Sequence, residues 1–299
     1  MKITLTGSIG RVGKPLTKKL IEQGHTVTVI SSSRERSEEI KNLGAIPAIG
    51  DLKDVVFLAA AFKDADAVYV MVPPANYFDP NLDLLAYFTE LGHTFAKAIE
   101  NSNTTRVVNL SSIGAHLKEG NGILEGTYEV EQLLNELPKK ITITHIRPTE
   151  IYYNLYGQMD LIKNQGILAG NLGEDNKNVW VALEDIADIV AEELTISSSG
   201  RRVRYAASDE LTYKELASAL GSAVGKPDLQ WTKISDVQLT ENLSTIGMNP
   251  RIAKQMTEMY AAIRSGLLYE DYNVNKPEKL GRVKMNDFAQ EFAAIYHKE

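Results

Sequence analysis

The chain has 299 residues, of which 43% are hydrophobic and 24% are charged, and its formal net charge is -7. This composition is that of a folded globular protein, and the acidic balance argues against nucleic acid as a partner because phosphate binding needs a concentrated basic surface. The absence of cysteine excludes disulfides, thiolate nucleophiles and thiolate metal ligands. The five histidines are scattered without ligand spacing, so we expect no metal site.

Two further exclusions concern targeting. No apolar run approaches the length of a membrane span. A strand pattern begins at Lys2, which leaves no room for a signal peptide ahead of it. We therefore expect a cytoplasmic protein whose partner is a small molecule and which binds neither a membrane nor nucleic acid.

The first predicted element is a strand over residues 2–6, and a glycine-rich turn follows it directly. A helix pattern begins near Arg11, and a second strand is predicted over residues 25–30. Glycines at such a turn permit positive φ and let the backbone approach a pyrophosphate at a helix N-terminus. A turn that binds nothing is the alternative, but the strand–turn–helix–strand context favours a dinucleotide site. The predicted cofactor-binding residues here are Gly7, Ser8, Ile9, Gly10, Arg11, Val12 and Gly13.

Strands and helices then alternate with short connections, which predicts a Rossmann-type α/β fold with a doubly wound parallel sheet. Pro47 predicts that the third strand lies at an edge of this sheet or ends irregularly. The elements predicted here are a helix over 34–43, strands over 45–49 and 66–72, a helix over 82–100, a strand over 106–110, a helix over 128–137 and a strand over 141–146.

Beyond residue 150 the pattern becomes mostly helical. We expect residues 1–150 to form an NAD(P)-binding domain to which 179–207 return, through a helix over 184–195 and a strand over 202–205. Residues 151–178 and 208–299 would form a smaller, mostly helical substrate domain that closes a cleft over the carboxyl ends of the strands. Its predicted helices lie over 212–224, 236–246, 250–265 and 286–296.

The end of the second strand bears on the choice of nucleotide. An NAD-selective site places an acid there to bind the ribose 2′-hydroxyl. This chain has three hydroxyls instead, Ser31, Ser32 and Ser33, followed by Arg34 and Arg36. Hydroxyls, arginine and helix amides suit a dianionic phosphate, so we predict NADP(H) as the preferred cofactor and NAD(H) as the alternative. The competing interpretation is that Ser33 only caps the next helix while both arginines are solvated.

Together these patterns resemble the NmrA-like branch of the atypical short-chain dehydrogenases/reductases. The resemblance spans nearly the whole chain and implies a Rossmann fold with an NAD(P)H cofactor. Members include quinone reductases, reductases of plant phenolics, and regulators that bind NAD(P) without turnover. Besides the glycine turn, the matching motifs are Gly50-Asp51-Leu52, Val72-Pro73-Pro74, Arg147-Pro148, Val181-x-x-x-Asp185-Ile186-Ala187, Glu210 to Ala217, and Gly281-Arg282.

The resemblance also implies roles for single residues. Asp51 and Leu52 would flank the adenine, while Val72 and Pro73 would lie along the ribose or nicotinamide. Asp51 is alternatively an N-cap for a helix starting near Lys53, and the two prolines alternatively only end a strand. In the family an arginine often stands at the position of Ser32, so Arg34 or Arg36 would have to reach back to take its place.

The catalytic residues are the least defined. The related dehydrogenases use a tyrosine with a lysine four residues later, and a serine at the end of the fifth strand. Ser111 or Ser112 matches the serine and Tyr128 the tyrosine, but Gln132 stands at the lysine position. A neutral amide cannot lower the pKa of a phenol as an ammonium does, so Tyr128 is alternatively a packing residue. Glu131 matches a glutamate of the quinone-reductase branch or is surface charge.

Two hypotheses remain. In the first, the chain is an NADPH-dependent reductase of a quinone or similar conjugated carbonyl, because such a substrate needs hydride positioning more than a strong acid. An aromatic group would then line the substrate slot or pack the core. In the second, the chain is a non-catalytic NADP(H) sensor. A sugar-nucleotide epimerase is disfavoured because it needs the intact tyrosine–lysine pair. The aromatic group comprises Tyr77, Tyr152, Tyr153, Tyr156 and Trp180.

Overall fold

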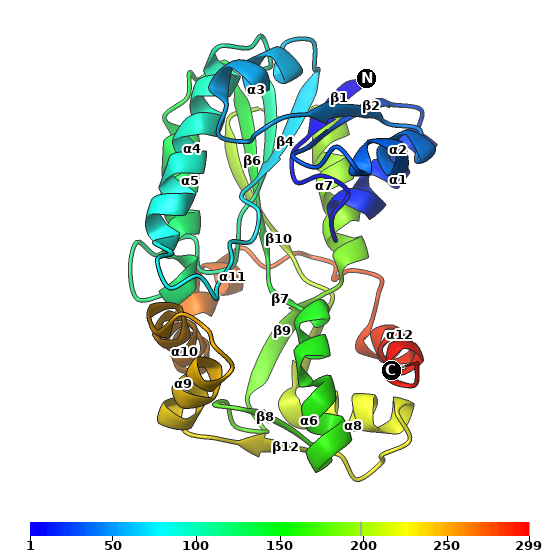
Figure 1. The fold of residues 1–299 in the computed structure, drawn as a ribbon, viewed down its shortest axis with the longest axis vertical. Coiled ribbons are helices and arrows are strands. Elements are labelled where there is room, and N and C mark those ends of the chain that lie inside the picture. Colours follow the sequence, from blue (N-terminus) through cyan, green and yellow to red (C-terminus); the bar gives the residue numbers. More distant parts are fainter. Residues whose placement is uncertain (198, 299) are drawn as a thin grey trace.

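The computed structural model describes residues 1–197 and 199–298. Figure 1 shows two lobes, of which the upper, here the sheet lobe, is built on a seven-stranded sheet of order β10-β6-β5-β4-β1-β2-β3. Every strand pair in this sheet is parallel, which confirms the predicted fold. The strands are β1 (Lys2–Leu5), β2 (Thr26–Ser31), β3 (Ile46–Ile49), β4 (Ala67–Met71), β5 (Arg106–Leu110), β6 (Thr142–Pro148) and β10 (Arg201–Ala206).

The strand order reverses between β1 and β4, where open parallel sheets bind their ligands. Both edges agree with the sequence. Pro47 lies in β3, an edge strand in which fewer backbone N–H donors are needed. The other edge is β10, which follows α7 in the sequence and pairs with β6. The central strands are buried on both faces, as their continuous apolar runs require.

Helices cover both faces of the sheet (Figure 1). One layer contains α1 (Gly13–Glu22), α2 (Arg36–Asn42) and α7 (Leu183–Thr195), and its side chains share a core with β1 and β2. The other contains α3 (Val55–Phe62), α4 (Leu84–Glu100) and α5 (Glu125–Asn135).

Two local interpretations require correction. The helix α3 is capped by Asp54, whose carboxylate accepts hydrogen bonds from the Val56 and Phe57 amides, so Asp51 is not its N-cap. The helix α2 begins at Arg36 without any side-chain cap, and the Ser33 hydroxyl instead donates to Glu35 at 2.9 Å. The interpretation of Ser33 as the cap of this helix is therefore wrong.

The lower lobe in Figure 1, here the small lobe, contains helices and two minor sheets that were not predicted. The helices are α6 (Met159–Gln165), α8 (Tyr213–Ala223), α9 (Asp236–Thr245), α10 (Pro250–Ser265), α11 (Glu270–Val274) and α12 (Met285–Tyr296). The strands are β7 (Glu150–Ile151), β9 (Lys177–Val181) and β11 (Asp209–Thr212) in one sheet, and β8 (Ile167–Gly170) with β12 (Gln230–Lys233) in the other.

A buried carboxylate joins the two lobes. Asp185, 3% exposed on α7, accepts hydrogen bonds from the Arg282 and Val283 amides at 3.1 Å and from the Ser208 hydroxyl at 2.6 Å. Gly281 lies so close that a Cβ there would stand 2.2 Å from the carboxylate. Two motifs about a hundred residues apart in the sequence thus form one clamp, which fixes the segment that leads into α12.

Candidate cofactor site and active site

The glycine turn follows β1 and is held in conformations that few side chains allow. Gly7 has φ +82°, and Ser8, at φ +56°, is the non-glycine residue with positive φ in the described part of the chain. A Cβ on Gly13 would stand 2.0 Å from the Ser8 carbonyl oxygen, so only glycine lets α1 begin this close to the turn. The turn thus brings backbone amides to the N-terminus of α1, which is the arrangement that binds a pyrophosphate.

A cavity of about 260 Å³ opens beside this turn, at the carboxyl ends of the strands. Its wall brings together predicted cofactor residues from four separate segments: the turn, the end of β2, the loop after β3 and the loop after β4. The lining residues are Gly7, Ser8, Ile30, Ser31, Ser32, Ser33, Arg36, Leu52 and Pro73.

Hydroxyls and one guanidinium concentrate at the β2 end of this cavity. The Ser8 hydroxyl donates to the Ser31 hydroxyl at 3.0 Å, and the Arg36 guanidinium donates to Ser8 at 3.3 Å. Both groups can instead turn toward an anion. Glu35 faces the same place, since it accepts the Ser33 hydroxyl, and its charge opposes an anionic ligand. A phosphate is therefore attracted to this end by the charge of Arg36 and repelled by the charge of Glu35.

Other predicted cofactor residues take different places. Arg34 is exposed and Asp51 is exposed with its carboxylate accepting the Lys53 amide at 2.9 Å, and neither lines the cavity. Val72 is half-buried beside Pro73 but is not a lining residue either.

Within the turn, the side chains of Ile9 and Val12 point into the core, each 8% exposed, and neither residue lines the cavity. Gly10 lies between them, where a Cβ would stand 3.2 Å from the Gly7 oxygen. Arg11 leaves the turn and lies over the ring of Tyr153 in the small lobe, 3.7 Å from its centroid. This cation–π contact connects the glycine turn to the small lobe.

Ser111, the predicted catalytic serine, follows β5 and donates to Glu131 on α5 at 2.5 Å. Glu131 is 2% exposed, which excludes the surface-charge interpretation. Its two oxygens bind Arg147 in a bidentate ion pair, at 2.9 and 2.6 Å. Burial opposes the charge of Arg147, yet the hydrogen bonds and charge of Glu131 outweigh it and raise the pKa of Arg147. Ser111 is therefore held by a structural ion pair.

The same network reaches the C-terminal part of the chain. Arg147 also donates to Asp271 on α11 at 2.8 Å, and the Tyr205 hydroxyl donates to the same carboxylate at 2.7 Å. The sequence motifs included Arg147 but gave no role to Asp271 or Tyr205, because no motif connects residues so far apart in the chain.

Tyr128, the predicted acid/base, is half-buried on α5, and its hydroxyl has no hydrogen-bond partner among the described residues. Gln132, one turn later, cannot supply the charge that would activate it. The aromatic group does not form one slot either. Tyr152 stacks between Trp180 and Phe288 in the small-lobe core, at centroid distances of 6.1 and 5.2 Å, whereas Tyr77 belongs to a separate cluster.

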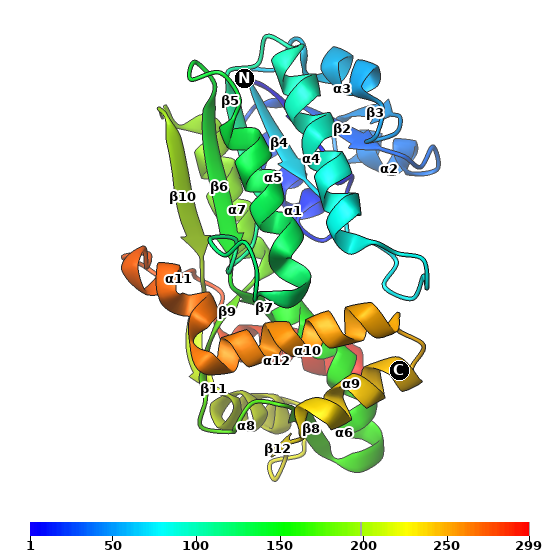
Figure 2. The same ribbon diagram turned by 90° about the vertical axis from the view of Figure 1, so that its left-hand side faces the viewer.

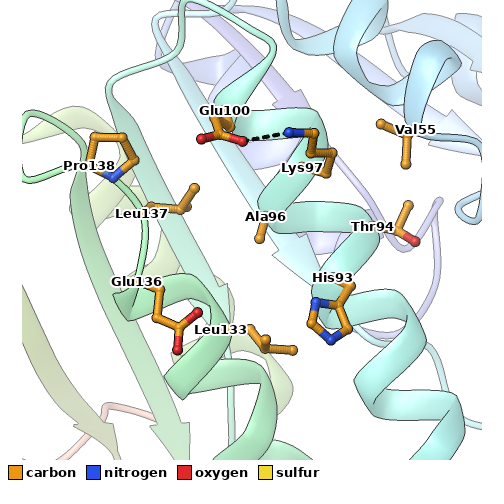
Figure 3. A pocket seen from close by; sticks show the side chains of 10 residues that line it. All are labelled: Val55, His93, Thr94, Ala96, Lys97, Glu100, Leu133, Glu136, Leu137 and Pro138. Atoms are coloured by element: carbon orange, nitrogen blue, oxygen red, sulfur yellow. Dashed lines mark hydrogen bonds and ion pairs between the residues drawn. The ribbon is translucent and has the colours of Figure 1, made fainter.

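A groove of about 490 Å³ on the outer helix layer is unrelated to this site. Figure 3 shows it between α4 and α5, with the ion pair of Lys97 and Glu100 at its rim. It shares no residue with the cavity at the glycine turn. Among the residues that the structure describes, no helix has the length and apolar character of a membrane span, and no three His, Asp or Glu side chains are grouped to hold a metal ion.

A parallel sheet with a glycine turn at its reversal point defines the class of Rossmann-type proteins. Within that class the chain belongs to the NmrA-like family, whose model matches residues 1–290. The NAD(P)H azoreductase of Xenophilus azovorans is 24% identical over 260 residues, which cover 87% of this chain and 86% of the relative.

Solved structures agree with this fold. The NADPH-dependent quinone oxidoreductase of Escherichia coli, complexed with NADPH, matches with a TM-score of 0.80 at 16% identity, covering 97% of this chain and 99% of the other. The triphenylmethane reductase of Citrobacter sp., complexed with NADP(H), matches with a TM-score of 0.75 at 16% identity over the same shares.

Proposed function

We propose that this protein is an oxidoreductase that binds NADPH and transfers its hydride to a quinone or similar conjugated carbonyl. The observation that carries the proposal is the cavity at the glycine turn, where Ser31 to Ser33 and Arg36 replace the acid of an NAD-selective site. Family membership and the similarity to reductases that bind NADPH support it.

The active-site residues favour an acceptor that needs little acid catalysis. Tyr128 lacks the neighbouring lysine that would activate it, and Ser111 is engaged with Glu131. A quinone accepts a hydride readily and spreads the resulting charge over its own ring, so positioning against the nicotinamide is the main requirement.

The test is NADPH oxidation with and without a panel of benzoquinones, naphthoquinones and azo dyes, together with calorimetric titration of NADPH and NADH. We expect acceptor-dependent oxidation and tighter binding of NADPH. Equal affinity for both nucleotides would contradict the cofactor preference, and absence of any binding would contradict the site itself.

Gln132 at the lysine position favours a second candidate, an NADP(H) sensor without turnover. The same panel separates the two, because a sensor binds NADPH tightly and oxidises none of the acceptors.

Arg36→Ala should weaken NADPH binding about tenfold and leave NADH binding unchanged, because a charge-assisted hydrogen bond to the 2′-phosphate is lost. The matched control is Arg34→Ala, which removes an arginine two residues away that does not line the cavity. Calorimetry on both variants decides which guanidinium binds the phosphate. A larger loss in Arg34→Ala would reverse the assignment.

Tyr128→Phe should leave kcat with a good quinone within about twofold, because the phenol has no charged partner to make it an efficient acid. Steady-state rates with NADPH across pH give the comparison. A loss of about a hundredfold with an altered pH profile would instead make Tyr128 the proton donor.

A further inference from the structure

The small lobe encloses a second cavity, separate from the cofactor site. It lies between α9 and α10 on one side and the strands β8, β9 and β12 on the other, in the lower half of Figure 2, and has a volume of about 140 Å³. None of its lining residues lines the cavity at the glycine turn. Its lining includes Glu150, Trp180, Tyr213, Trp231, Leu243 and Tyr260.

One carboxylate faces this cavity without a cation. Glu150 is the only charged side chain in the lining, and it forms no ion pair with any residue that the structure describes. Asn178 and Tyr213 donate to its Oε2 atom, the latter at 3.3 Å. No residue that the structure describes donates a hydrogen bond to its Oε1 atom, which is not among the polar atoms that are fully covered without a partner. Oε1 is therefore not fully covered, in a residue that lines the cavity.

Such a carboxyl is costly to keep inside a lobe, because a buried charge needs a partner. Burial raises the pKa of Glu150 to about 7, against the opposing hydrogen bonds from Asn178 and Tyr213. The tyrosines that feel its charge, Tyr213, Tyr260 and Tyr269, all have a pKa raised by burial and stay neutral around this pH. A cationic ligand would supply the missing partner.

Aromatic rings form the walls around this carboxyl. Trp231 lies against Tyr213 at a centroid distance of 4.2 Å, and Trp180 meets Tyr213 edge to face at 5.9 Å. Tyr260 adds a hydroxyl that forms no hydrogen bond within the described chain. Rings of this kind attract cations over their faces. The volume is close to the roughly 150 Å³ of an engineered cavity that holds one benzene, so the space fits a single ring.

The remaining wall is loosely packed. Helix α9 has no fully buried residue, and Leu239 and Leu243 are its two contributions to the lining, both half-buried. Asn154, at the other side, is exposed and marks where the cavity meets solvent. A small ligand thus has a route in without disturbing the sheet lobe.

We propose that this cavity binds a monocyclic arylalkylamine, with its ammonium group on Glu150 Oε1 and its ring against the tryptophan and tyrosine side chains that line the wall. The site goes beyond the proposed reductase activity and does not depend on it. Binding should strengthen as the pH rises through the pKa of Glu150, because the carboxylate form pairs with the ammonium and the acid form does not.

The chain carries its own reporter for this site. It has two tryptophans, Trp180 and Trp231, and both line the cavity, so tryptophan fluorescence responds directly to occupancy. Titration with benzylamine should give a saturable fluorescence change, confirmed by calorimetry. Benzyl alcohol has the same shape without the charge, and its affinity should be lower than that of benzylamine by a factor of about ten or more. Equal affinity for the two would overturn the ammonium assignment, and no saturable change would overturn the site.

Two variants test the assignment of groups. Glu150→Gln keeps the shape and should lose the benzylamine preference and its pH dependence. Leu243→Phe fills the cavity from the loosely packed helix and should abolish binding of both probes, so it remains informative where Glu150→Gln fails to fold. Thermal melting shows that each variant is folded. Saturating NADPH should leave benzylamine affinity unchanged, and displacement would place the amine in the cofactor cleft and overturn the separate site.

Discussion

Arg147→Met is expected to lower the free energy of unfolding by about 3–5 kcal/mol, because it leaves the Glu131 carboxylate buried without a cation. Both partners of this ion pair are almost fully covered, with side-chain exposures of 6% and 3%. The variant also frees Asp271, which holds α11 against the sheet lobe. Urea denaturation of the two proteins measures the loss.

Lys97→Met is the matched control for that measurement. It breaks an ion pair of similar length, 2.9 Å to Glu100, whose two side chains are 60% and 49% exposed (Figure 3). Exposed pairs contribute little, so its stability should stay close to that of the native chain. Equal effects of Lys97→Met and Arg147→Met would show that the Glu131 pair is not desolvated as the structure indicates.

Gly13→Ala is expected to weaken NADPH binding about a hundredfold, because the added Cβ overlaps the backbone of Ser8 and forces the turn away from α1. The clash is with a carbonyl oxygen at 2.0 Å, which has no flexible end to move. Calorimetry gives the affinity, and thermal melting shows whether the fold survives.

Gly157→Ala controls for the substitution itself. No atom lies within 4 Å of a Cβ at that position, and its φ is not in the region that favours glycine. We expect unchanged NADPH affinity there. Retention of full affinity in Gly13→Ala would mean that the turn does not approach the pyrophosphate.

Much of the sheet lobe was predictable from the sequence because its signals are local. A glycine turn behind a strand, and short apolar runs between helical patterns, specify parallel pairing without knowledge of distant residues. The edge position of the strand that contains Pro47 could be predicted because proline has no backbone N–H to donate to a neighbouring strand. The seven-stranded order then confirmed the class of fold.

The candidate site was predictable only in part. The serines after β2 reached the cavity as expected because they are fixed to a strand end, but the choice between Arg34 and Arg36 depends on where α2 begins. Helix boundaries are set by capping and tertiary contacts, which periodicity does not resolve. Glu150 gave no signal at all, since its importance comes from what surrounds it.

The connection between the lobes has a consequence for engineering. The chain leaves the sheet lobe after β6, returns after β9, leaves again after β10, and is clamped to α7 at Gly281 before α12 begins. A single crossover between two relatives therefore cannot exchange one lobe for another, and no single cut yields two self-contained fragments. A chimera would need matched junctions at each passage, with the Asp185 clamp taken from one parent.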